Sequence, residues 1–297
     1  MEQMTFHKDA LSILAPAKIN LSLLIAGKRP DGFHALETVM AKVDWYDEIL
    51  IQPGERAGIE LICKGPCWAP DGAENLVYQA AQLLCEKYHL DPDLRMTLTK
   101  NIPAGTGLGS ASSDAAATLM GLNRFLKLNL DQQHLFAMAA ELGSDVSFFL
   151  NGPLAFCTGK GDIVEKINQI YDFLALLILP DLSVSTARVY TNYTHNPALY
   201  QKLHAQLNSY IREKKIDLVV RTCTNMLQES CFNLEKSLAE LRDTVESLGF
   251  GPCCLSGSGS SLFCIFECAN QQKATQCQKA IAKRTGCQSI IVRNNKW

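Results

Sequence analysis

One glycine-rich segment constrains this chain more than any other. It reads IPAGTGLGSASSD over residues 102–114, between an expected strand at 95–100 and an expected helix at 110–126. Glycine permits a sharp turn and a close approach of backbone amides to an anion, and the helix start adds unpaired N–H groups and partial positive charge. Ser110, Ser112 and Ser113 add hydroxyl donors. The segment therefore predicts a phosphate-binding loop, with an ordinary strand-to-helix connection capped by serines as the alternative.

The spacing of the glycines excludes two common kinds of phosphate loop. No Gly-Lys-Ser/Thr sequence follows them, as a Walker A loop requires. They alternate as GxGxG, whereas dinucleotide-binding folds use GxGxxG. A dinucleotide-dependent oxidoreductase is therefore disfavoured.

Composition and charge limit the kinds of binding partner and the cellular location expected for this chain. The 297 residues carry 28 Lys and Arg against 30 Asp and Glu, a net charge of −2, which gives no reason to expect nucleic acid or an anionic membrane as a partner. No run approaches the roughly 20 apolar residues of a membrane span, and the first ten residues lack the apolar segment of a secretory signal. The 12 cysteines include no CxxC pair, so we expect reduced, structural thiols in a cytoplasmic protein.

The two halves of the chain differ in their expected elements. The first half combines strands at 17–25, 36–43, 48–52 and 95–100 with helices at 74–88, 110–126 and 131–142. The second half begins with a buried strand at 173–179 and continues with helices to about 249, strands at 253–255 and 261–266, a helix at 271–285 and a strand at 289–292. We therefore expect an α+β chain of two domains, 1–165 and 166–297.

Three further motifs accompany the glycine-rich loop. PAKIN, residues 16–20, places Lys18 and Asn20 on one face of a strand. LGSDV, residues 142–146, places Asp145 just after a helix end. LSGSGSS, residues 255–261, is a small-residue turn between apolar strands. Taken alone, PAKIN is typical of a row of surface residues on a strand, LGSDV of a helix N-cap and LSGSGSS of a hairpin turn. If a phosphate binds nearby, however, the backbone amides of LSGSGSS could approach it closely and bind it as well.

In this order the four motifs resemble the GHMP kinases, which include galactokinase, homoserine kinase and mevalonate kinase. The likeness runs from residue 14 to about 266. RPDGFHAL, residues 29–36, is similar to the cytidine-binding segment of those members that act on a cytidine diphosphate-linked methylerythritol. The resemblance implies a β-rich N-terminal domain, like domain 2 of ribosomal protein S5, and a ferredoxin-like C-terminal domain, with ATP and substrate meeting between them.

The resemblance also assigns roles to residues. It implies Asp145 as the catalytic carboxylate and Lys18 as the catalytic lysine. The residues implied for ATP are Pro103, Ala104, Gly105, Thr106, Gly107, Leu108, Gly109, Ser110, Ala111, Ser112 and Ser113, with Asn75 and Lys100 on the adenine side. Those implied for substrate are Asn20, Phe33, His34, Thr186, Tyr190, Gly257, Ser258 and Gly259, with Phe33 and Tyr190 stacking on the base. Mg²⁺ is expected with ATP, and Ser112 is its candidate ligand.

The implied activity is ATP-dependent phosphorylation of the 2-hydroxyl of that substrate, in non-mevalonate isoprenoid biosynthesis, by a monomer or weak homodimer. A GHMP kinase with a different alcohol substrate is one alternative. A catalytically silent protein that binds ATP and a metabolite to regulate a partner is another, but the intact Lys18 and Asp145 argue against it. The chain departs from the family pattern at Ser147, where proline is usual, and at Thr106 and Ala111, where glycine is frequent.

Overall fold

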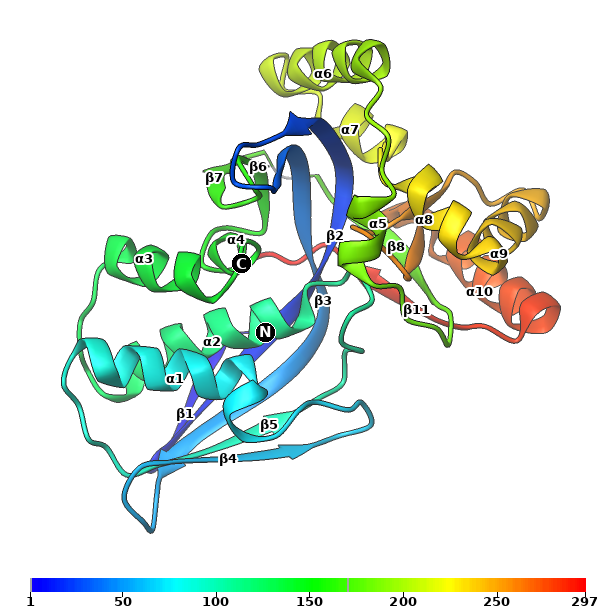
Figure 1. Ribbon diagram of the computed structural model, residues 1–297. Coiled ribbons are helices and arrows are strands. Elements are labelled where there is room, and N and C mark those ends of the chain that lie inside the picture. The colour runs from blue at the N-terminus through cyan, green and yellow to red at the C-terminus, as the bar shows by residue number, and fades with distance from the viewer. Residues whose placement is uncertain (1, 170) are drawn as a thin grey trace.

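The computed structural model describes residues 2–169 and 171–297 and contains two sheets, each packed against helices. The first sheet comprises β1 (Met4–His7), β2 (Ala10–Lys28), β3 (His34–Pro53), β4 (Ile59–Lys64), β5 (Leu94–Thr99), β6 (Leu154–Thr158) and β7 (Ile163–Lys166). Its order is β1-β2-β3-β5-β4, and the β6–β7 hairpin pairs with β3. A long antiparallel pair, β2–β3, crosses the middle of the molecule from end to end (Figure 1).

The long strands β2 and β3 connect the two parts of the core. Their paired residues extend from Leu11 and Ile51 at one end to Lys28 and His34 at the other. The register shifts between Pro16 and Ala17, because proline has no N–H to donate and is tolerated in strands at such irregularities. The sequence predicted two strands at 36–43 and 48–52, and the structure joins them into β3 across this irregularity.

Helices cover one side of the first sheet. They are η1 (Gly72–Glu74), α1 (Leu76–Lys87), α2 (Ser110–Phe125), α3 (Gln132–Leu142) and the short α4 (Val146–Phe149). The run Ala115–Ala117 is buried in α2, so small side chains bring this helix close to β2 and β3. The predicted cap of α3 is present, since Asp131 Oδ1 accepts a hydrogen bond from the backbone N–H of His134 at 3.0 Å.

The second sheet has the order β11-β8-β10-β9, with every pair antiparallel. Its strands are β8 (Phe173–Leu179), β9 (Cys253–Leu255), β10 (Leu262–Glu267) and β11 (Gln288–Arg293). Its helices are α5 (Thr186–Thr191), α6 (Pro197–Arg212), α7 (Ile216–Thr222), α8 (Gln228–Leu234), α9 (Lys236–Ser247), η2 (Cys268–Asn270) and α10 (Gln271–Thr285). This βαββαβ succession is the ferredoxin-like arrangement that the sequence resemblance implied.

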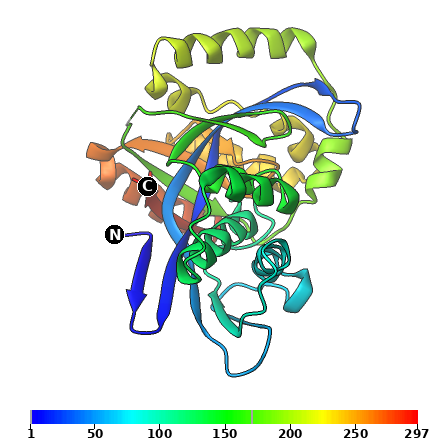
Figure 2. The same ribbon diagram turned by 90° about the vertical axis from the view of Figure 1, so that its left-hand side faces the viewer.

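The two sheets share a hydrophobic core, because β2 contributes to both sides. Leu23 in β2 donates its N–H to the carbonyl of Thr224 at 2.7 Å, and its own carbonyl accepts from Met226 N–H at 2.9 Å. Helix α6 lies above the ends of β2 and β3, along one edge of the molecule (Figure 2). The chain passes from the first sheet to the second between Lys166 and Phe173.

Four strands were not expected from the sequence: β1, β4, β6 and β7. Strand β7 is exposed along most of its length, and β4 is at most half-buried, so neither has the apolar alternation that marks a half-buried strand. All twelve cysteines are unpaired, and most are buried in the core. Among the described residues, no helix has both the length and the apolar character needed to cross a membrane.

Lys42 in β3 is a buried cation at the centre of this arrangement. Its side chain is among the largest that are fully buried, and its ammonium donates to the carbonyl oxygens of Phe149 at 3.0 Å and Asn151 at 2.7 Å. Burial lowers the pKa of Lys42 from 10.5 to about 7. Lys42 thus ties β3 to the end of α4, the short helix that follows Asp145.

This burial predicts a pH-dependent stability. Between about pH 7 and 10.5 the unfolded chain holds a proton on Lys42 that the folded protein has lost, so stability rises with pH. Relative to Lys42→Met, the wild type should gain up to about 1.4 kcal/mol per pH unit in this window. Urea unfolding at pH 7.5 and 9 would measure the difference. The control is Lys202→Met on α6, where the lysine is exposed, and wild-type and Lys42→Met curves that shift in parallel would contradict the prediction.

Candidate active site

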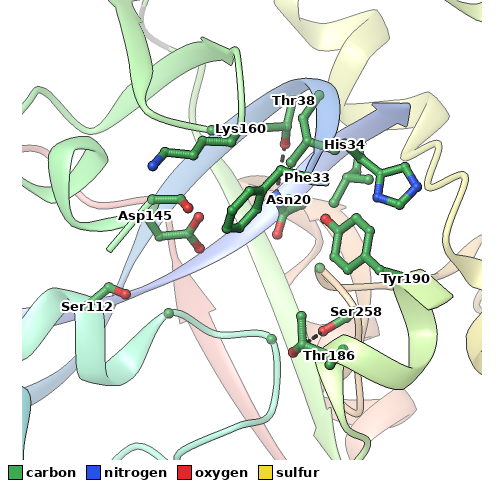
Figure 3. Close-up of a pocket in the computed structure, with 18 of the residues that line it drawn as sticks. Asn20, Phe33, His34, Thr38, Ser112, Asp145, Lys160, Thr186, Tyr190 and Ser258 are labelled. Atoms are coloured by element: carbon green, nitrogen blue, oxygen red, sulfur yellow. Dashed lines mark hydrogen bonds between the residues drawn. The ribbon is translucent and has the colours of Figure 1, made fainter. Parts of the chain in front are cut away.

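A cavity of about 920 Å³ is lined by both parts of the fold. Its lining combines β2, the β2–β3 turn, the glycine-rich loop, the start of α4, the β6–β7 turn, α5 and the turn after β9. The lining residues that the sequence predicted are Lys18, Asn20, Phe33, His34, Gly105, Gly107, Gly109, Ser110, Ala111, Ser112, Asp145, Thr186, Tyr190, Gly257 and Ser258. Asp145 and Ser112 lie at one end, His34 and Tyr190 at the other, and Phe33 between them (Figure 3).

The glycine-rich loop uses its alternating glycines for conformation and for close packing. Gly105, Gly107 and Gly109 have φ values of +72°, +81° and +70°, in the left-handed region. A Cβ at Gly107 would lie 2.1 Å from the carbonyl oxygen of Ser256, and one at Gly109 would lie 2.8 Å from Lys18 Cγ. The loop therefore lies directly against Lys18 and the second domain. It delivers the N-terminus of α2 to the cavity, where Ala111 and Ser112 line the wall.

Lys100 anchors the two ends of this loop. Its ammonium donates to Asp47 Oδ2 and Asp114 Oδ2, both at 2.5 Å, and to the hydroxyl of Ser110. Asp47 Oδ1 also accepts the backbone N–H groups of residues 101 and 102, at 2.6 and 2.8 Å. Burial works against the charge on Lys100, but the two carboxylates outweigh it and hold the Lys100 pKa above its ordinary value. Burial raises the pKa of Asp114, against the opposing effect of Lys100.

Asn75 and Lys100, which the sequence resemblance implied for the adenine side, both have side chains bound by other parts of the protein, and their adenine-side role stays a prediction. Lys100 is 2% exposed, and its ammonium is enclosed by its protein partners. Asn75 caps α1, accepting from Val77 N–H at 2.9 Å and donating to the carbonyl of Pro70 at 2.8 Å. Neither is among the described residues that line the cavity. The partners of Asn75 are its sequence neighbours, whereas Asp47, one of the partners of Lys100, lies far away in the sequence.

Several other predicted residues also lie outside the lining and support it from behind. They are Pro103, Ala104, Thr106, Leu108, Ser113 and Gly259. The Leu108 carbonyl accepts from Lys18 N–H at 2.9 Å, and the Thr106 carbonyl accepts from Ser261 N–H at 3.0 Å. A Cβ at Gly259 would lie 3.0 Å from Cys231 Sγ, so this glycine faces the core.

Lys18 and Asp145 meet at one end of the cavity. Lys18 Nζ lies 3.6 Å from Asp145 Oδ2 and donates to Asn20 Oδ1 at 2.5 Å. Asn20 in turn donates to Thr38 Oγ1 at 2.8 Å. The Lys18 side chain is 4% exposed and that of Asp145 is 38% exposed, so the ammonium is buried behind a carboxylate that faces the cavity. Asp145 precedes α4 but makes no capping hydrogen bond with its side chain, which leaves the carboxylate free for another role.

Aromatic rings gather at the other end. The ring centroid of His34 lies 5.2 Å from that of Tyr190 and 5.9 Å from that of Tyr193. Burial lowers the pKa of His34, and the charge of Lys28 adds to the effect, which favours a neutral imidazole at pH 7. Burial raises the pKa of Tyr190, so its phenol is neutral as well. Phe33, at the tip of the β2–β3 turn, is 56% exposed.

The turn after β9 fastens the second domain to the glycine-rich loop. Ser256 donates its hydroxyl to the carbonyl of Gly107 at 2.9 Å. The hydroxyls of Thr186 and Ser258 lie 2.8 Å apart at the cavity wall (Figure 3). Asn225 donates to the carbonyls of Leu255 and Gly257, at 2.9 and 2.7 Å, and so fixes the shape of the turn.

Several lining residues were missed by the sequence reasoning. They include Lys28, Leu36, Thr38, Ser144, Lys160, Gly161 and Tyr193. Thr38 and Leu36 lie on β3, where their spacing resembles that of any strand. Lys160 carries the one available signal, because it stands between two glycines in a short turn, TGKGD.

The lining suits Mg²⁺ bound together with nucleotide phosphates. Ser112 and Asp145 both present oxygen atoms to the same end of the cavity (Figure 3). The described part of the chain holds no group of three or more His, Cys, Asp or Glu residues suited to a metal ion. Mg²⁺ commonly takes one or two protein oxygens and completes its shell with phosphates and water, so this sparse set of oxygens fits it.

Comparison with known proteins shows that this chain is similar to them in both sequence and fold. The chain matches the GHMP kinases N terminal domain over residues 75–153 and the GHMP kinases C terminal domain over residues 207–286. It is 37% identical to the 4-diphosphocytidyl-2-C-methyl-D-erythritol kinase of Geobacillus thermodenitrificans, over 86% of this chain and 88% of the relative. Identity to the kinase of that name from Citrifermentans bemidjiense is 36%, over 95% of this chain and 98% of the relative.

Solved structures of related proteins have a similar fold. A crystal structure of 4-(cytidine 5'-diphospho)-2C-methyl-D-erythritol kinase superposes with a TM-score of 0.74 at 30% identity, covering 96% of this chain and 99% of that one. Homoserine kinase from Cytophaga hutchinsonii, with a TM-score of 0.76 at 20% identity, covers 98% of this chain and 96% of its own and shares the fold. The chain belongs to the GHMP kinase family, and over most of its length its relatives are 4-diphosphocytidyl-2-C-methyl-D-erythritol kinases.

Proposed function

We propose that this protein transfers the γ-phosphoryl group of ATP to the 2-hydroxyl of 4-diphosphocytidyl-2-C-methyl-D-erythritol, a step of isoprenoid precursor biosynthesis. The relatives' names supply the substrate. The observation that carries the proposal is one cavity with a Lys18–Asp145 pair and a glycine-rich loop at one end and a cluster of aromatic rings at the other. Such a cavity suits a long substrate with a reacting alcohol at one end and a base at the other.

The glycine-rich loop is proposed to bind the phosphates of ATP. Amides near Gly105 and Gly107 and the N-terminus of α2 offer N–H groups and partial positive charge to an anion. Ser112 is the candidate protein ligand of Mg²⁺, which when bound neutralises charge on the phosphates. Lys100 acts here as a positioning residue, because it holds both ends of the loop and lies behind it.

Asp145 and Lys18 are proposed to act on the reacting groups. Phosphoryl transfer depends mostly on positioning and on neutralising charge. Asp145 would accept the proton of the substrate hydroxyl and orient that hydroxyl. Lys18 would fix the carboxylate and neutralise charge on the transferred group, and its own position is set by Asn20 and, through it, Thr38. A loose transition state makes a modest base sufficient, so orientation is the larger part of the contribution of Asp145.

The aromatic end is proposed to bind cytosine. Phe33 and Tyr190 offer faces for stacking, and the neutral His34 offers a ring nitrogen to the edge of the base. The relatives' names point to a small-molecule substrate, and we expect this chain to act on it as a monomer or weak homodimer. The free cysteines support a cytoplasmic location.

Asp145→Asn tests the reacting end. The amide keeps the shape of the carboxylate but cannot accept the proton, so kcat should fall by roughly 10²–10⁴-fold while the affinity for ATP changes little. Steady-state kinetics and nucleotide titration would measure the two effects. The matched control is Glu141→Gln, which removes an exposed carboxylate from α3. A variant that retains wild-type kcat would remove Asp145 from the chemistry, whereas a wild type that binds ATP but turns over no alcohol would favour a silent regulator.

Phe33→Ala tests the aromatic end. Stacking contributes about 1–3 kcal/mol per base, so KM for the cytidyl substrate should rise by roughly 5–150-fold with KM for ATP unchanged. The control is Phe6→Ala, because Phe6 on β1 is 57% exposed, close to the exposure of Phe33, and lies outside the cavity lining. Equal KM values for wild type and Phe33→Ala would instead favour a GHMP kinase with another alcohol substrate.

A further inference from the structure

The proposed substrate raises a question of charge. It carries a diphosphate between cytosine and the methylerythritol, so the diphosphate must lie between the aromatic end of the cavity and Asp145. Bound phosphate oxygens need donors, and cations are the strongest of these. Of the cations that line the cavity, Lys18 already contacts Asp145 and Asn20. Lys28 is paired with His34 across the β2–β3 ladder and so belongs to the aromatic end.

Lys160 lies close both to Phe33 and to the reacting end of the cavity. Its ammonium lies 5.6 Å from the centroid of the Phe33 ring. The next residue borders the reacting end, since a Cβ at Gly161 would lie 3.6 Å from Asp145 Oδ1. Figure 3 shows the Lys160 side chain extending over the cavity on the side of Asp145 and Phe33. One residue therefore bridges the groups proposed for the base and for the alcohol.

The backbone of Lys160 is held while its ammonium is left available. Its N–H donates to Asp162 Oδ1 at 3.0 Å, and the carbonyl of Gly159 accepts from Leu36 N–H at 2.7 Å. Gly159 and Gly161 have φ values of +71° and +103°, which fixes a tight turn that few other residues allow. Within the described residues, no carboxylate lies within 4.0 Å of Lys160 Nζ. This differs from the ion-paired Lys18 and from Arg29, which pairs with Asp31.

We propose that Lys160 is a specificity-determining residue whose ammonium binds the diphosphate of the substrate. This inference rests on the proposed function. Lys160 sets the distance between the stacked base and the hydroxyl presented to Asp145, and it favours substrates with an anionic linker over neutral ones. A second role, in which Lys160 only steadies the Phe33 ring through a cation–π contact, makes a different prediction for ligands that lack phosphate.

Two ligands separate these roles: CDP, which has the diphosphate, and cytidine, which lacks it. Calorimetric titration of the full chain with each would be compared among wild type, Lys160→Met and Lys160→Arg. The control is Lys166→Met, in the same hairpin but outside the described cavity lining. We expect Lys160→Met to lose about tenfold or more in affinity for CDP and less than about twofold for cytidine, Lys160→Arg to recover most of the loss, and the control to match wild type.

Each other result overturns the inference in a distinguishable way. Equal losses for CDP and cytidine would show that Lys160 acts through Phe33. Unchanged affinity for both, with a wild type that prefers CDP, would show that other groups bind the diphosphate and would leave the proposed function intact. A wild type that binds neither CDP nor cytidine would overturn the proposed function and this inference together.

Discussion

The site depends on a buried cation that holds the glycine-rich loop. Lys100, at the end of β5, contacts Asp47 of β3 and both Ser110 and Asp114 of α2. These contacts fix the strand before the loop and the helix after it, so the glycines between them have little freedom left. Removing one partner from such a buried cluster leaves an uncompensated charge, which is far costlier than losing a surface ion pair. The same geometry that commits Lys100 to its carboxylates also keeps it from the cavity.

The other parts of the site are positioned by their contacts with this fixed loop. The loop lies against Lys18 through Gly109 and receives the second domain through Gly107 and Ser256. Strand β2 continues past Lys18 and Asn20 into the shared core, which places the aromatic end of the cavity on the same pair of strands as the reacting end. Lys42 secures the segment after Asp145 from the other side. The segment that Lys42 holds contains Ser147, at the position where the family usually has proline.

The sequence predicted the parts of this site whose signals are local. The glycine loop, the paired Lys18 and Asn20, Asp145 after a helix end, and the cap of α3 each depend on a few neighbouring residues. The limits of β8, β9 and α10 were also predicted, because an apolar run or a capped amphipathic helix marks its own ends. The ferredoxin-like second domain came from the family resemblance.

The features of the site that could not be predicted depend on residues that are far apart in the sequence. Asp47 lies more than fifty residues before Lys100, so nothing near Lys100 in the sequence indicated that its side chain belongs to a buried ion cluster. The β6–β7 hairpin has little apolar alternation, and its turn delivers Lys160 to the cavity only through its pairing with β3. Lys42 appears in the sequence as an ordinary strand lysine, and only the fold surrounds it with carbonyl groups.

The central claim is that one cavity joins a cytidine-binding end to a phosphoryl-transfer end. The most direct test is an assay of ADP release with Mg-ATP that compares 4-diphosphocytidyl-2-C-methyl-D-erythritol with the methylerythritol phosphate that lacks the cytidyl group. We expect turnover of the cytidyl compound and little or none of the shorter one. Equal turnover of both would contradict the cytidine-binding end, and turnover of neither would contradict the claim as a whole.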